Sequence, residues 1–133
     1  MKKLLALLVF CLAFTPPIVR AVDWVRVTGN NQVITYIDVD SIKMSNGKVY
    51  FWYLNDFTPH IPDSPDTLSS KNFTSITDCD LLSYQRLTTT FFSEHLGNGN
   101  VTATFEEKDP VSYAIPESIM GHIVEWVCDF IKR

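Results

Sequence analysis

The stretch PESIMGHIVEWVCDFI, residues 116–131, decides how the rest of the chain is arranged. Its apolar residues recur at spacings of three and four, which places them on one stripe of an α-helix. The stripe consists of Ile119, Ile123, Trp126, Val127 and Phe130, widened by Met120, Val124 and Ile131. So broad an apolar face must be buried against another element, and the segments that precede it are strand-like. We therefore expect a helix over residues 116–131, with Pro116 in the first helical position, packed on a β-sheet.

The upstream segments have the composition of β-strands. β-branched and aromatic residues are frequent in them, and turn residues separate them. The expected strands are residues 24–28, 33–37, 48–57, 71–78, 82–93 and 101–105. Residues 38–42 (DVDSI) change character and predict a tight turn or one helical turn. The pattern predicts an α+β fold, in which a meander-like antiparallel sheet of about five to six strands carries a C-terminal helix.

The longest strand is apolar on both of its faces. It follows a predicted hairpin turn at Asn46-Gly47, and alternation divides its large side chains into two sets. One set is Tyr50, Trp52 and Leu54, and the other is Val49, Phe51, Tyr53 and Phe57. A single helix covers only part of one face, whereas a sheet with one wet side would show a polar face. We therefore expect a partner, first of all a second copy of this chain, to cover the other face. Tyr50, Trp52 and Leu54 are the candidate contact surface, and their counterparts Val49, Phe51 and Tyr53 are the alternative, because alternation does not tell which face the helix covers. Curvature of the sheet into a partial barrel is the alternative.

The first 21 residues are typical of a secretory signal peptide. Lys2 and Lys3 precede an apolar run over residues 4–14, which is too short to span a bilayer as a helix. We expect cleavage after Ala21, which leaves a single domain over residues 22–133.

A lipoprotein signal is the alternative interpretation of this leader. Cys11 would then be the lipidated residue, but the bulky Phe10 directly before it argues against this. We expect the exported chain in the periplasm or at the outer cell surface.

The charge of the exported chain excludes several classes of partner. The leader holds three of the 11 basic residues and none of the 15 acidic ones, so 8 basic residues remain against 15 acidic residues, a net charge of −7. Without a basic run, neither nucleic acid nor an anionic membrane surface is an expected partner. No later segment is long and apolar enough to be a transmembrane helix.

Cys79 and Cys128 are the cysteines outside the leader. Export places them in an oxidising compartment, where two cysteines in one small domain favour a disulfide. A Cys79–Cys128 bridge would tie the helix to the sheet. Two free buried thiols are the alternative.

The sequence offers weak candidates for catalysis or metal binding. Ser118, His122 and Glu125 fall at helical spacings, but consecutive turns of one helix rarely aim a serine at a histidine, and no GxSxG motif is present. His60 and His95 show no metal-ligand spacing with another histidine. We expect no catalytic residues, no cofactor and no metal.

Several motifs together resemble the surface-adhesin E (protein E-like) family of small exported bacterial proteins. They are WVRV (24–27), YIDVDSI (36–42), GKVYFWYLNDF (47–57), DC (78–79), TTTFFSEHLGNGN (88–100) and YAIPESI…VC (113–128). The resemblance implies an antiparallel sheet with a disulfide-attached C-terminal helix, and homodimers built through the sheet. It also implies a non-enzymatic adhesin that binds host extracellular-matrix proteins. The alternatives are a soluble periplasmic protein with a housekeeping role and, third, a small periplasmic hydrolase.

Overall fold

The structure, a computed structural model, describes residues 22–58 and 67–133. The predicted signal peptide, residues 1–21, lies outside the described residues. Its cleavage after Ala21 therefore stays a prediction.

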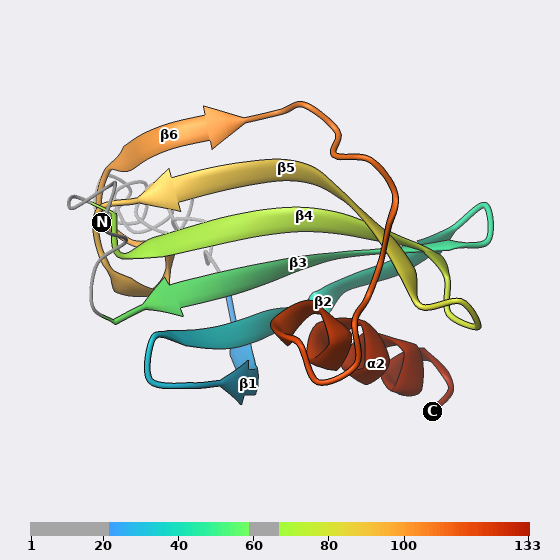
Figure 1. Cartoon of the computed structure of the whole chain (residues 1–133). Helices are drawn as coiled ribbons and strands as arrows, with labels where there is room; N and C mark the ends of the chain where they lie inside the picture. Colours follow the sequence, from blue (N-terminus) through green and yellow to red (C-terminus); the bar gives the residue numbers. More distant parts are fainter. Residues whose placement is uncertain (1–21, 59–66) are drawn as a thin grey trace, which may run out of the picture.

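Six strands, consecutive in the sequence, form an antiparallel meander (Figure 1). They are β1 (Trp24–Gly29), β2 (Val33–Ser45), β3 (Lys48–Phe57), β4 (Ser69–Asp78), β5 (Ser83–Phe92) and β6 (Val101–Phe105). Each strand pairs with its neighbours in sequence, so the order across the sheet is β1-β2-β3-β4-β5-β6. A short seventh strand, β7 (Ser112–Tyr113), pairs with the start of β5. The predicted antiparallel sheet is confirmed.

The expected turn at residues 38–42 is wrong, because β2 continues through it. The register between β2 and β3 shifts between Asp38 and Lys43, so the extra residues are absorbed as an irregularity in one long strand. Ser41 bridges the gap with its side chain. Its hydroxyl donates to the Asp38 carbonyl (2.6 Å) and accepts from the Trp52 backbone N–H (2.8 Å). Ser41, one of the polar residues that suggested a turn, therefore supplies hydrogen bonds where the strand ladder is interrupted.

Helix α2 (Ile119–Ile131) is present, but it begins later than expected. Glu117 has a left-handed backbone (φ +65°), which an α-helix excludes, so neither Glu117 nor Pro116 belongs to the helix. Ser118 is the N-cap, and its hydroxyl accepts from the Gly121 backbone N–H at 3.0 Å. A serine cap satisfies one of the free N–H groups of the first turn, which a proline start would leave unpaired.

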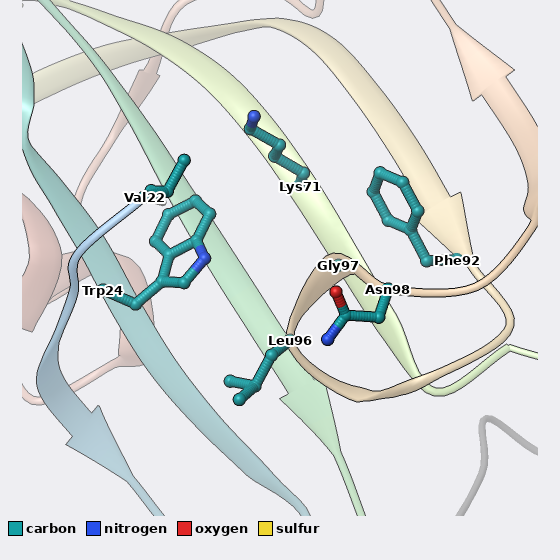
Figure 2. A pocket seen from close by; sticks show the side chains of 7 residues that line it. All are labelled: Val22, Trp24, Lys71, Phe92, Leu96, Gly97 and Asn98. Atoms are coloured by element: carbon teal, nitrogen blue, oxygen red, sulfur yellow. The ribbon is translucent and has the colours of Figure 1, made fainter. Parts of the chain in front are cut away.

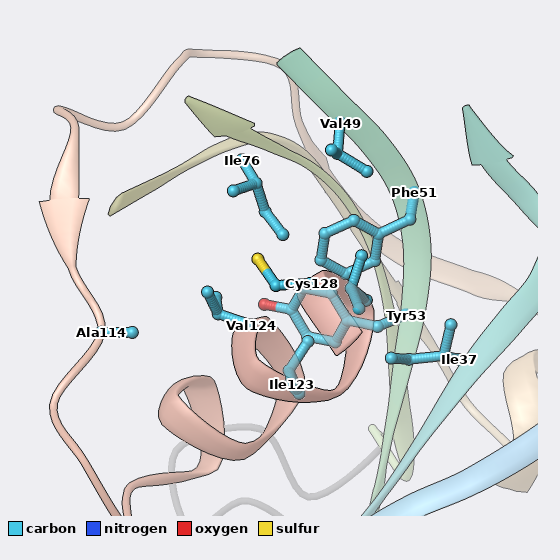
Figure 3. Packing of buried hydrophobic residues seen from close by; sticks show 10 residues of the cluster. Ile37, Val49, Phe51, Tyr53, Ile76, Ala114, Ile123, Val124 and Cys128 are labelled. Carbon is cyan, nitrogen blue, oxygen red and sulfur yellow. The ribbon is translucent and has the colours of Figure 1, made fainter. Parts of the chain in front are cut away.

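The main core lies between α2 and one face of the sheet (Figure 3). Ile123, Val124 and Val127 are fully buried on the helix. They pack with a set of sheet residues that includes Ile37, Val49, Phe51, Tyr53 and Ile76. Full burial of each such aliphatic or aromatic side chain stabilises the fold by about 1.5–3 kcal/mol. The helical stripe predicted from the sequence is thus the stripe that closes the core.

Away from the helix, the same face of the sheet is lined by polar residues. Thr35 and Asn72 are buried there, at 0% and 2% exposure. The Thr35 hydroxyl donates to Asn55 Oδ1 (2.8 Å), and the Thr89 hydroxyl donates to Asn72 Oδ1 (2.9 Å). These cross-strand hydrogen bonds offset the cost of burying the polar groups.

Cys79 and Cys128 form the predicted disulfide, with their Cα atoms 5.8 Å apart. Cys79 directly follows β4, and Cys128 lies in the second half of α2. The bridge therefore joins the helix to the β4–β5 end of the sheet, in addition to the apolar contacts of the core.

Candidate functional site

The face of the sheet opposite α2 is the candidate functional surface, and we name it the open face. A row of paired residues crosses it from β1 to β4: Trp24 pairs with Asp38, Asp38 with Trp52, and Trp52 with Phe73. Directly paired residues of antiparallel strands lie on the same face. Because Val49, Phe51 and Tyr53 face the helix, alternation along β3 places Tyr50, Trp52 and Leu54 on the open face.

Four aromatic residues and one lysine form a cluster on the open face, which we name the aromatic cluster: Trp24, Tyr50, Trp52, Phe73 and Lys71. The Phe73 ring lies 4.9 Å from the Trp52 ring and 5.9 Å from the Tyr50 ring, between centroids. The Lys71 ammonium lies 4.9 Å from the centre of the Trp52 ring and 5.8 Å from that of Trp24. Both distances are within the range of cation–π attraction. The cluster is therefore held together across three strands and presents its aromatic rings with a positive charge among them.

The three predicted contact residues differ in their exposure. Tyr50 and Trp52 are half-buried on the open face. Leu54 is fully buried (0% exposed), so its assignment to an exposed contact surface is wrong. The reason is that the 3₁₀ turn η1 (His95–Gly97) covers it. A Cβ atom on Gly97 would lie only 3.2 Å from Leu54 Cδ1.

The loop over residues 93–100, which contains η1, is fixed on the end of the open face by side chains of β3 and β4. Asp56 accepts from the Leu96 backbone N–H (3.2 Å) and pairs with His95 Nδ1 (2.8 Å). The Ser69 hydroxyl accepts from the Gly97 backbone N–H (2.9 Å) and donates to the Glu94 carbonyl (2.6 Å). Sequence reasoning identified a turn here but did not predict where it docks. The polar residues Asp56 and Ser69, at the ends of otherwise strand-like segments, were the available signal.

A groove lies between this loop and the aromatic cluster (Figure 2). It has a volume of about 560 Å³ and is lined by Val22, Trp24, Lys71, Phe92, Leu96, Gly97 and Asn98. The lining comes from the start of the described chain, from β4, from the end of β5 and from the loop. It is mostly apolar with one cation, a composition common in sites for small amphipathic ligands.

On the helix side, burial controls the protonation of Tyr53. Desolvation raises the pKa of this phenol to about 12, although the nearby Arg86 guanidinium opposes the shift. Arg86 also donates to Asp109 Oδ2 at 2.8 Å, an ion pair at the surface that fixes the loop before β7 against β5. A neutral phenol at this depth is part of the core and has no access to a substrate.

The weak catalytic candidates on the helix do not form a site. The Ser118 hydroxyl is engaged as the N-cap and donates to the Ile115 carbonyl. His122 and Glu125 are exposed on the outer side of α2. Within residues 22–58 and 67–133, no three His, Cys, Asp or Glu side chains are placed to hold a metal ion together. In the same ranges, no helix has the length and hydrophobicity to cross a membrane.

Solved structures share this fold. Crystal form II of Haemophilus influenzae protein E superposes with a TM-score of 0.65 at 19% identity, covering 90% of this chain and 98% of that chain. Another structure of Haemophilus influenzae protein E superposes with a TM-score of 0.61 at 20% identity, and the match covers 88% of this chain and 92% of that chain. Protein E from non-typeable Haemophilus influenzae superposes with a TM-score of 0.57 at 19% identity, and the match covers 87% of this chain and 82% of that chain. At these identities the likeness establishes the fold.

Comparison with the sequences of curated proteins finds no match. A model of the family described as Surface-adhesin protein E, however, matches residues 24–129, from the first residue of β1 almost to the end of α2. The chain therefore belongs to the surface-adhesin protein E family.

Proposed function

We propose that this protein is an exported, non-enzymatic adhesin that binds a host extracellular-matrix protein. The observation that carries the proposal is the match of residues 24–129 to the surface-adhesin family. The signal-like leader supports export with cleavage after Ala21. The family supports action of the domain over residues 22–133 at the outer surface.

The open face is the surface that we propose for this contact. The apolar residues of the other face are buried beneath α2 and take no part in binding unless the fold opens. On the open face, Trp24, Tyr50 and Trp52 are only half-buried, and the Phe73 ring packs against Tyr50 and Trp52. Tryptophan and tyrosine are enriched among the residues that dominate the binding energy of protein interfaces. Because these rings already pack against one another, they also lose little side-chain conformational entropy on binding.

A second copy of the chain is the other candidate occupant of this face. The homodimer predicted from the sequence would cover the aromatic cluster and pair the outer edges of β1 or β6, which are the ends of the strand order. Such a dimer would compete with a matrix protein for the same face, and sedimentation tests it separately from matrix binding.

Two measurements test the proposed function. The exported protein should be found in the outer-membrane or surface fraction, and it should bind at least one purified matrix protein saturably in surface plasmon resonance. A protein confined to the periplasm that binds none of a broad panel would contradict the proposal and support the housekeeping alternative. Hydrolysis of ester or peptide substrates that is lost in a Ser118→Ala variant would contradict the non-enzymatic assignment.

A further inference from the structure

The groove at the loop end of the open face has one apolar wall on each side. Trp24 lies on the β1 side, and Phe92 lies on the β5 side (Figure 2). Leu96, on the loop, supplies a third apolar side chain and is 41% exposed. A hydrocarbon chain or ring placed between these side chains would remove apolar surface from water on both of its sides.

Lys71 supplies the positive charge of the groove. The salt bridges found in the described parts of the chain are Arg86–Asp109 and His95–Asp56, so Lys71 has no carboxylate partner among these residues. Its ammonium instead rests against the rings of Trp24 and Trp52. Aromatic rings orient a cation but leave its N–H donors free for an anion. Cleavage after Ala21, proposed above, would make Val22 the first residue and leave a second ammonium group at the rim of the groove.

The loop wall is held in place before any ligand binds. Besides its bonds to Asp56 and Ser69, the loop closes on itself. The Ser93 backbone N–H donates to the Asn100 carbonyl (2.9 Å), and the Asn98 backbone N–H donates to the His95 carbonyl (3.2 Å). A groove with fixed walls binds without first having to order a loop.

We propose that this groove binds a small amphiphilic carboxylate. The apolar part would lie between Trp24, Phe92 and Leu96, and the carboxylate would pair with Lys71. Lys71 and the Val22 ammonium of the processed chain attract an anionic head group. The mostly apolar lining favours a singly charged carboxylate, because a phosphate dianion loses more hydration energy when it enters the groove. This site goes beyond the proposed adhesin function, because it needs no host protein and is measured without one.

The test uses the exported, processed protein with decanoate below its micelle concentration as the probe, and decanol and decyl phosphate as head-group controls. Calorimetry and tryptophan fluorescence should both report saturable 1:1 binding of decanoate. Trp24, which lines the groove, and Trp52, which contacts Lys71, are the reporters, since Trp126 stacks on Phe130 in the helix. Decanoate should bind at least about tenfold more tightly than decanol. Equal binding of decanol, or tighter binding of decyl phosphate, would overturn the assignment of the head group.

Two pairs of variants locate the site. Lys71→Met keeps the length of the side chain and should weaken decanoate binding at least about tenfold, whereas Lys48→Met, at the exposed β2–β3 turn, should have no effect. Leu96 has a left-handed backbone (φ +57°), which Asn and Asp adopt more readily than Leu, so changes here are compatible with the fold. Leu96→Asp should bind decanoate more weakly than Leu96→Asn because of like-charge repulsion. No saturable binding by the wild type, or equal affinities within either pair, would refute the proposal.

Discussion

Removal of the Cys79–Cys128 disulfide should destabilise the domain strongly. The two cysteines are 49 residues apart, so the bridge closes a loop of about 50 residues. In the chain-entropy treatment of cross-links, a loop of that size lowers the entropy of the unfolded chain by about 14 cal/mol/K, which corresponds to about 4 kcal/mol at 25 °C. Domains of this kind have unfolding free energies of about 5–15 kcal/mol. Loss of the bridge would therefore remove a large part of the stability while leaving the apolar contacts of α2 in place.

The assay compares three forms of the exported protein by urea unfolding, followed by circular dichroism. They are the oxidised wild type, the reduced wild type, and a Cys79→Ser, Cys128→Ala double variant. Reduction keeps both sulfur atoms and so isolates the cross-link. The variant loses in addition the packing of the Cys128 sulfur, which is 3% exposed, at a further cost of about 1 kcal/mol. A reduced wild type within about 1 kcal/mol of the oxidised form would refute the reasoning, as would free alkylation of both thiols in the native protein.

Three further predictions follow from the core, the leader and the open face. The Tyr53 phenol has a pKa near 10 in the unfolded chain, and burial raises this pKa to about 12 in the folded protein. The folded state therefore favours the neutral phenol. The resulting stabilisation is complete below pH 10 and is lost as the pH rises toward 12. The free energy of unfolding should fall by about 1.4 kcal/mol by pH 11 through this titration, and Tyr53→Phe should remove this part of the fall. Urea unfolding of both proteins at pH 9 and pH 11 measures it. Equal falls in the wild type and the variant would count against this prediction. The intact mass of the exported protein should correspond to a chain that begins at Val22, and a mass that includes lipid on Cys11 would rule this out. Sedimentation at micromolar concentration should give the mass of a dimer that Trp52→Thr shifts toward the monomer, whereas a strictly monomeric wild type would exclude the dimer.

The helix and the strands were predictable because each has a local signature. The three-and-four spacing from Ile119 to Phe130 places a stripe on a helix whatever the rest of the chain does. Alternation from Lys48 to Phe57 likewise predicted a strand with two apolar faces. In both segments the side-chain period was enough to predict the type of element.

Features set by distant residues were not predictable. Alternation could not tell which face of β3 the helix covers, because both sets of side chains are large. Leu54 is buried by a loop some forty residues later in the chain, held by Asp56 and Ser69. The start of α2 was predicted too early, at Pro116. The left-handed backbone at Glu117 excludes both residues from the helix and leaves Ser118 as its N-cap. The groove could not be predicted either, because its lining comes from four separate segments of the sequence.

We propose that this adhesin-family protein binds a matrix protein through the open face. The most direct test is surface plasmon resonance of the matrix protein that binds most tightly, against wild type, Trp52→Thr and Ile115→Thr. Ile115 is 72% exposed, lies just before α2 and serves as the matched control. With all three proteins folded at the assay temperature, Trp52→Thr should weaken binding at least about tenfold, and Ile115→Thr should leave it within about twofold. Unchanged binding by Trp52→Thr would contradict the proposed role of the open face, as would an equal loss of binding by Trp52→Thr and Ile115→Thr.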